Sequence, residues 1–304
     1  MGVMDGKTVL VTGAGRGIGR EIALCIASAG GKVIVNDLGS GLKGECGDED
    51  PANQVVAEIA VAGGMAQANG GNVADPEQAQ AMVRQAIETY GQIDAVINVA
   101  GILRDAMFHK MEQSQWQSVI DVHLTGCYNV ARAAIEPMKA QGSGAMLHFT
   151  SASGLHGNIG QANYSAAKMG IVGLSRVIAQ EGQRYGVRSN ALAPFAWTRM
   201  LEQIPVHSEK MRNALEKVKA NERAEQIAPV ATYLVSPAAV GVSGQVFGVR
   251  GNEIYLMSQP RPLRSIHNAA GWTPDSLANM LEPTLRRSFV DMDTGGKFYS
   301  WDAI

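Results

Sequence analysis

The amino-acid sequence predicts an α/β fold in which helices cover both faces of a doubly wound parallel sheet. Short apolar, β-branched runs alternate with longer amphipathic segments along most of the 304 residues. This alternation is typical of parallel strands joined by right-handed helical crossovers. The middle runs are apolar almost throughout, as expected for strands buried on both faces. A glycine cluster lies between the first strand and the first helix, where such folds bring the backbone close to a ligand.

Local patterns place each element. Asp75, Pro76 and Glu77 supply a helix cap, a proline at the first helical position and an acid in the first turn, and this helix should end at Tyr90. The glycine-rich, charged residues 39–51 are expected to form an exposed loop. On the same criteria we expect strands at residues 7–12, 32–37, 65–68, 93–99, 145–150 and 187–193, and helices at residues 20–29, 53–62, 76–90, 112–139 and 162–185.

Residues 1–250 are predicted to form one domain, followed by a C-terminal extension at residues 251–304. Pro260 and Pro262 punctuate this extension, and a short amphipathic helix is expected from Thr273 through Arg287. Its last segment contains the aromatic residues Phe298, Tyr299 and Trp301. We therefore expect it to pack on the body or on a neighbouring subunit.

The composition excludes several classes of protein. The formal net charge is −2, so no strong field attracts nucleic acid or an anionic membrane. The longest apolar runs fall short of the ~20 residues that span a bilayer, and we expect no signal peptide before the first strand. Cys25, Cys46 and Cys127 lie far apart and lack metal-ligand spacing. We expect reduced thiols, no metal, a cytoplasmic setting and a small-molecule substrate.

The first strand leads into the turn Thr12-Gly13-Ala14-Gly15-Arg16-Gly17-Ile18-Gly19 and then into a helix. Such a turn lets the backbone approach a pyrophosphate, and the helix N-terminus supplies N–H donors and a positive dipole end. The spacing is Gly13-x-x-x-Gly17-x-Gly19, a variant of the G-x-G-x-x-G pattern. The sequence thus predicts a Rossmann-type dinucleotide site.

Asp37 ends the second strand, eighteen residues after Gly19. A carboxylate there can accept hydrogen bonds from both ribose hydroxyls of adenosine and repels a 2′-phosphate. Arg16 in the turn is the one feature that favours a 2′-phosphate. Asp37 carries more weight because of its position, so the expected cofactor is NAD.

Tyr164 and Lys168 are four residues apart in a predicted helix and therefore share one face. A nearby ammonium favours the phenolate, so this pair suggests a general base. Ser151 follows the preceding strand, thirteen residues before Tyr164, and its hydroxyl could bind the substrate oxygen.

With these motifs in this order, the sequence resembles the short-chain dehydrogenase/reductase family over about residues 5–250. The resemblance implies that Tyr164 is the acid/base, that Ser151 orients the substrate oxygen, and that Lys168 lowers the pKa of the tyrosine and holds the nicotinamide ribose. It also implies a set of cofactor-binding residues: Gly13, Arg16, Gly17, Ile18, Gly19, Asp37, Asn72, Val73, Asn98, Ala100, Gly101, Tyr164, Lys168, Pro194 and Thr198.

Segments 36–39, 101–105 and 151–168 resemble one subgroup more closely. This is the (3R)-hydroxyacyl-CoA dehydrogenase domain of multifunctional β-oxidation enzyme type 2, also described as a 17β-hydroxysteroid dehydrogenase. The resemblance implies NAD-dependent oxidation of a 3-hydroxyacyl-CoA or a hydroxysteroid in lipid or sterol metabolism. If a CoA thioester is bound, the expected cations are Arg104, Arg199, Arg261 and Arg264.

Two departures from the family pattern concern the site. His123 stands where the family usually has a catalytic asparagine, so either a relay role or a merely structural one is open. Phe195 and Trp197 replace a familiar Pro-Gly segment, and we expect them to line an apolar substrate pocket with Met200 and Leu201.

Two alternatives remain beside the dehydrogenase hypothesis. One is a 3-oxoacyl thioester reductase, which runs the same chemistry in reverse. The other is a cofactor-binding regulatory protein that has lost catalysis, for which the only support is His123. The helices at 112–139 and 162–185 usually form a four-helix interface in this family, so a homodimer or homotetramer is expected.

Overall fold

The computed structural model describes residues 2–41, 43–45, 50–197, 208–292, 301 and 303. Within these residues eight strands form one sheet in the order β3-β2-β1-β4-β5-β6-β7-β8. All neighbours pair in parallel except β7 and β8. The predicted doubly wound sheet is confirmed. The strands are β1 (Thr8–Thr12), β2 (Lys32–Asn36), β3 (Met65–Asn69), β4 (Ala95–Asn98), β5 (Gly144–Phe149), β6 (Val187–Phe195), β7 (Val246–Arg250) and β8 (Glu253–Leu256).

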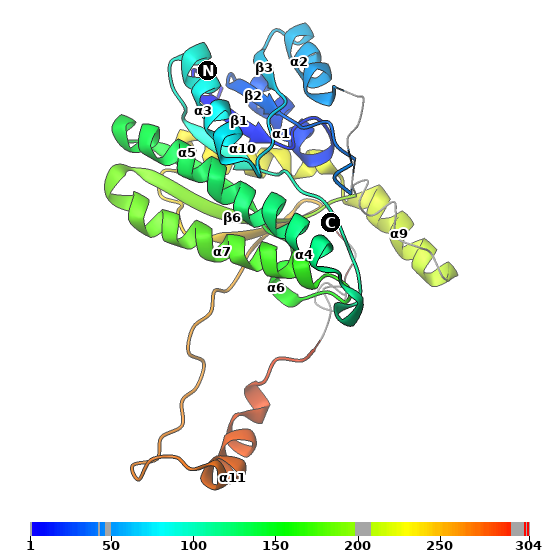
Figure 1. The fold of residues 1–304 in the computed structure, drawn as a ribbon, viewed down its shortest axis with the longest axis vertical. Coiled ribbons are helices and arrows are strands. Elements are labelled where there is room, and N and C mark those ends of the chain that lie inside the picture. Colours follow the sequence, from blue (N-terminus) through cyan, green and yellow to red (C-terminus); the bar gives the residue numbers. More distant parts are fainter. Residues whose placement is uncertain are drawn as a thin grey trace.

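Helices cover both faces of the sheet (Figure 1). One apolar core joins the sheet to α1 (Gly17–Ser28), α2 (Pro51–Val61) and α10 (Ala228–Val235). The opposite core joins it to α3 (Pro76–Tyr90) and α5 (Gly126–Gln141), with α7 (Ala162–Gly182) beside α5. Asp75 caps α3 by accepting hydrogen bonds from the backbone N–H groups of Glu77 and Gln78, as its sequence predicts.

The order in which the chain adds strands to the sheet reverses between β1 and β4, although these two strands are parallel. From β1 it moves outward through β2 and β3, then returns to β4 on the other side of β1 and continues to β8. Ligands of open α/β sheets bind beyond the carboxyl ends of the strands at such a switch point. The glycine turn follows β1 directly, so it lies at this point.

The predicted helix at 112–139 is continuous but irregular. It consists of α4 (Gln113–Ile120), a π-helical segment (Asp121–Thr125) and α5. A π-helical insertion shifts the register of side chains and backbone carbonyls, and such insertions are frequent at functional sites. His123 lies at the centre of this one.

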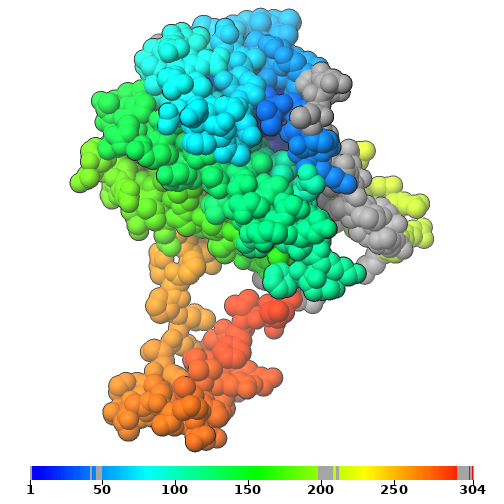
Figure 2. All heavy atoms as spheres, in the orientation of Figure 1, coloured from blue at the N-terminus to red at the C-terminus, as the bar shows by residue number. Residues whose placement is uncertain are grey.

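A short strand lies just beyond residue 250, where the sequence places the end of the first domain. β8 adds an antiparallel strand to the edge of the sheet, so the body continues to Leu256. The chain then leaves the body, and α11 (Pro274–Leu285) lies at the far end of an extended segment (Figures 1 and 2). None of the residues of α11 is buried. We call residues 257–292 the arm.

The remaining helices are short or peripheral. α6 (Ala152–His156) follows β5, and α9 (Glu209–Asn221) projects from the body (Figure 1). Short 3₁₀ turns lie at Phe108–Lys110, Gln183–Tyr185, Ala224–Gln226, Pro237–Ala239 and Arg286–Ser288. No helix among the described residues combines the length and apolarity that a bilayer crossing requires.

Candidate active site

A cavity of about 990 Å³ opens at the carboxyl ends of the central strands. This volume is at the upper end of the range of small-molecule and cofactor sites. Most of the predicted site residues line it, namely Gly13, Arg16, Gly17, Ile18, Gly19, Asp37, Asn72, Val73, Ala100, Gly101, His123, Ser151, Tyr164, Lys168, Pro194 and Phe195. Segments that are far apart in the sequence therefore meet in one place.

The glycine turn is shaped for close approach by a ligand. Gly17 has a φ of +53°, and a Cβ built on it would project into open space. Gly17 begins α1, so the first N–H groups of this helix face the cavity without intrahelical partners. A pyrophosphate fits these donors and the positive end of the helix dipole. The residues present thus fit the phosphate portion of a dinucleotide.

Asp37 follows β2 and lies beside this turn. One carboxylate oxygen accepts a hydrogen bond from the N–H of Gly15 at 2.9 Å, and the other accepts from the N–H of Gly39 at 2.8 Å. These bonds fix the carboxylate at the wall of the cavity while its remaining lone pairs stay available. The position suits a group that accepts hydrogen bonds from ribose hydroxyls.

Tyr164, Lys168 and Ser151 come together from two elements. Tyr164 and Lys168 lie one turn apart on α7, with Nζ of Lys168 5.6 Å from the centre of the Tyr164 ring. Ser151 caps α6 by accepting a hydrogen bond from the N–H of Ser153, and its hydroxyl is near enough to Tyr164 to lower the pKa of that phenol. All three line the same cavity. The arrangement can bind an oxygen atom between two hydroxyl groups and exchange a proton with it.

The electrostatics of this group differ from the simple expectation that Lys168 lowers the pKa of Tyr164. Burial raises the pKa of Tyr164, the hydrogen bond with Ser151 lowers it, and the charge of Asp105 raises it further. Burial also lowers the pKa of Lys168 to about 8. The Lys168 ammonium donates a hydrogen bond to the carbonyl of Phe149 at 2.6 Å. In the protein alone, burial therefore dominates both groups.

His123 packs edge-on against Tyr164, with the ring centres 5.1 Å apart. Its Nε2 lies 2.8 Å from the carbonyl oxygen and 3.1 Å from the N–H nitrogen of Ile102, so its tautomer decides which of the two it bonds. A Cβ on Gly101 would come within 2.2 Å of the imidazole, so only glycine fits there. Burial, followed by the charge of Lys168, lowers the pKa of His123 to about 3. These surroundings disfavour the imidazolium form, and the ring lies beside Tyr164 in the lining of the cavity.

Some predicted residues lie elsewhere. Asn98 is buried behind the cavity, where its amide lies 3.1 Å from Nδ1 of His148. Trp197 is not among the lining side chains, and its backbone N–H donates to the carbonyl of Glu222. Arg261 and Arg264 are exposed on the arm rather than at the cavity. Outside the described residues lie Cys46, Thr198, Arg199, Met200, Leu201, Phe298 and Tyr299.

Sequence reasoning missed several lining residues, because they belong to loops and helix ends without a motif. Asp105 and Gln161 form one such pair, with Nε2 of Gln161 donating to the Asp105 carboxylate at 2.8 Å. Val218 and Glu222 come from the end of α9 and the residue after it. Asp105 and Gln161 lie in segments that resemble the subgroup, 101–105 and 151–168, but the resemblance assigned no role to either.

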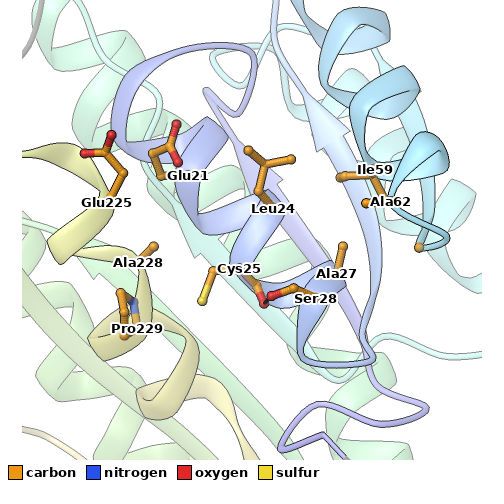
Figure 3. A pocket seen from close by; sticks show the side chains of 11 residues that line it. Glu21, Leu24, Cys25, Ala27, Ser28, Ile59, Ala62, Glu225, Ala228 and Pro229 are labelled. Carbon is orange, nitrogen blue, oxygen red and sulfur yellow. Dashed lines mark hydrogen bonds between the residues drawn. The ribbon is translucent and has the colours of Figure 1, made fainter.

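A second cavity of about 430 Å³ lies between α1, α2 and α10 (Figure 3). Its lining includes Cys25, Glu21 and Glu225, together with apolar side chains such as Leu24 and Ile59. None of the predicted site residues contributes to it, so the chemistry belongs to the first cavity.

The sheet order and the position of the glycine turn are typical of dinucleotide-binding proteins, and Ser151, Tyr164 and Lys168 line the same cavity. Residues 7–209 match the family model described as short chain dehydrogenase. The chain belongs to this family of oxidoreductases, as its motifs predict.

Among curated relatives, the peroxisomal hydratase-dehydrogenase-epimerase of Saccharomyces cerevisiae is 40% identical over 276 residues, which cover 90% of this chain and 29% of that protein. The peroxisomal multifunctional enzyme type 2 of Mus musculus is 48% identical over 200 residues, covering 66% of this chain and 27% of that protein. The predicted resemblance to this subgroup is confirmed. The chain spans less than a third of the length of both relatives.

Solved structures agree with the fold. A short chain dehydrogenase from Mycobacterium avium is 38% identical, with a TM-score of 0.81, and the match covers 94% of this chain and 96% of that one. A 7α-hydroxysteroid dehydrogenase complexed with NADH and 7-oxo glycochenodeoxycholic acid is 29% identical, with a TM-score of 0.73, covering 82% of this chain and 95% of that one.

Proposed function

We propose that the protein oxidises the secondary alcohol of a 3-hydroxyacyl-CoA thioester, with NAD as the hydride acceptor. The observation that carries this proposal is the meeting of Ser151, Tyr164 and Lys168 in one cavity with the glycine turn and Asp37. The likeness to the dehydrogenase part of the multifunctional enzymes supports the substrate class. The cytoplasmic setting stays a prediction, since both relatives are named as peroxisomal proteins.

In this proposal each residue of the site has a separate role. Ser151 donates a hydrogen bond to the substrate oxygen and Tyr164 accepts its proton. Lys168 holds the ribose next to the nicotinamide and adds positive charge that favours the tyrosinate. Bound NAD supplies the site that accepts the hydride and a positive ring that acts in the same direction. Asp37 supports NAD over NADP, because a carboxylate repels a 2′-phosphate.

Arg104 supports a substrate that carries an anionic or carbonyl-rich tail. Among the cations expected to bind CoA, it is the one whose described side chain lines the cavity. Its Nε is buried and has no hydrogen-bond partner among the described residues. Asn163 holds the backbone of this residue by donating to its carbonyl at 3.0 Å. A guanidinium at this place in the lining is suited to phosphate or carbonyl oxygens of a bound substrate.

A substrate panel tests the proposal. We expect turnover of 3-hydroxyacyl-CoA with NAD to exceed that of the same hydroxy acid without CoA, because remote binding energy positions the reacting carbon. Arg104→Glu should raise KM for the thioester and leave the Kd of NAD unchanged, whereas Arg84→Glu, on the exposed surface of α3, should change neither.

Three results would redirect the proposal. Equal efficiency on thioesters and free steroid alcohols would favour the hydroxysteroid substrate, which the similarity to the 7α-hydroxysteroid dehydrogenase supports. Much faster turnover of 3-oxoacyl thioesters with reduced cofactor would favour the reductase. Cofactor binding without turnover of any substrate would indicate the regulatory protein.

A further inference from the structure

Trp301 contacts the strands β7 and β8 at the edge of the sheet. The indole N–H of Trp301 lies 3.0 Å from one carboxylate oxygen of Glu253 and 3.2 Å from the other. Its ring meets that of Tyr255, with the ring centres 6.4 Å apart. The Arg250 guanidinium lies 6.0 Å from the centre of the Trp301 ring. Trp301 therefore covers the turn between β7 and β8.

Arg250 connects this turn to the interior. Its Nε donates to the Glu222 carboxylate at 2.8 Å, and both side chains are buried. The stability of a buried ion pair depends on its geometry, because neither charge recovers its hydration energy if the two groups move apart inside the protein. The Trp301 ring lies within cation–π range of the guanidinium and adds an attraction that favours this position of Arg250.

The other end of this chain of contacts is the substrate cavity. Glu222 lines it, and the carbonyl of Glu222 accepts the N–H of Trp197. Arg250 is the register partner of Phe195, another lining residue. A shift of the ion pair would therefore move the wall formed by Phe195 and Glu222.

We propose that Trp301 is a positioning residue of the substrate pocket that acts through the Arg250–Glu222 ion pair. It sets the position of the wall on the substrate side and does not touch the reacting atoms. The glycine turn and Asp37 lie on other elements, at the opposite strands of the site. Substrate binding should thus depend on Trp301, while cofactor binding should not.

The test compares three variants of the full chain. Trp301→Ala should raise KM for the hydroxyacyl-CoA roughly threefold to tenfold, the range expected for a partly shielded cation–π contact, and change kcat less. Trp301→Phe keeps a ring over Arg250 and should restore most of the wild-type KM. Met292→Ala, a fully exposed position at the end of the arm, is the control and should match the wild type.

A double-variant experiment identifies the route. If Trp301 acts through Glu222, then adding Trp301→Ala to Glu222→Gln should raise KM no further than Glu222→Gln does alone. Additive effects would overturn the proposed route. An unchanged KM in Trp301→Ala would overturn the proposal altogether.

The inference rests on the proposed function, since KM is measured with its substrate, but the two fail differently. A wild-type protein without turnover of any substrate contradicts the proposed function. A wild-type protein with normal turnover and an insensitive Trp301→Ala variant contradicts only the inference. The Kd of NAD, measured by fluorescence for every variant, shows whether the fold and the cofactor site are intact.

Discussion

Tyr164 and Lys168 share one face of α7, yet burial shifts their pKa values in opposite directions. It raises the pKa of the phenol and lowers that of the ammonium, because an apolar environment disfavours the charged form of each. In the protein alone the pair is thus closer to neutrality than two exposed side chains would be. The positive ring of bound NAD would favour the tyrosinate at Tyr164, which links the strength of this base to cofactor binding.

At Tyr164, replacement by phenylalanine removes the proton-transfer oxygen and little else. We expect Tyr164→Phe to lower kcat by about 10²–10⁴-fold, the usual contribution of a general acid or base. The Kd of NAD should stay near the wild-type value in a fluorescence titration. A variant that retains most of the wild-type rate would place the base on another residue.

The charge on Lys168 should lower the free energy of unfolding of the cofactor-free protein below about pH 8, the pKa of Lys168 in the folded state. Burial lowers this pKa from 10.5 to about 8, so the charged form costs free energy below pH 8, and this cost disappears above the unfolded value of 10.5. Lys168→Met should therefore raise the free energy of unfolding at pH 7 by roughly 1–3 kcal/mol, net of the lost hydrogen bond to Phe149. In urea titrations the gain should shrink as pH rises from 8 to 10. An equal gain at both pH values, or the same gain in the exposed control Lys110→Met, would contradict this account.

Asp37 should determine the choice of cofactor. Asp37→Ser removes the charge that repels a 2′-phosphate, while its hydroxyl can still accept from one of the backbone N–H groups of Gly15 and Gly39. We expect kcat/KM for NADP to rise relative to that for NAD. Asp37→Glu keeps the charge and serves as the control. If the wild-type protein already prefers NADP, the role assigned to Asp37 is wrong.

Helices and strands were predicted correctly from the sequence where the local residue types decide the structure. Asp75 and Pro76 begin α3 as expected, and β-branched runs became the central strands. β8 and α10 were missed, because β8 is a short edge strand and α10 is apolar nearly all round, without a helical stripe. The motif residues of the site were predictable. Its walls at Asp105 and Glu222 were not, since tertiary packing alone brings them to the cavity.

The outer faces of α5 and α7 carry apolar side chains that the single chain leaves exposed. Tyr128 on α5 is 51% exposed, and Met169 and Val177 on α7 are 45% and 48% exposed. We propose that a second copy covers this face, as the family resemblance implies. Val177→Glu should then lower the molar mass measured by native light scattering at micromolar concentration. Val61→Glu, at an exposed site on α2, should not. A monomeric wild-type protein would contradict the proposal.

At the scale of the whole molecule, the arm is the segment whose helix, α11, does not pack on the body. Met280 and Leu281 on α11 are 41% and 40% exposed, and the helix buries no side chain. We propose that the arm packs on a neighbouring subunit, one of the two arrangements expected from the sequence. Amide hydrogen exchange in α11 should then be slow in the wild-type oligomer and fast in a dissociated Val177→Glu variant. Equally fast exchange in both would indicate an unpacked arm.

The antiparallel strand β8 also bears on how the protein avoids aggregation. A parallel sheet that ended at β7 would present a buried-type strand with free backbone groups to any passing chain. β8 covers that edge with only four residues, and Pro260 and Pro262 follow shortly after it. Proline has no N–H to donate, so a further strand could not continue its ladder along this segment. The edge of the sheet is thus a strand of only four residues, and the prolines beyond it limit how far a partner strand could extend past Ile254 and Leu256, which are exposed.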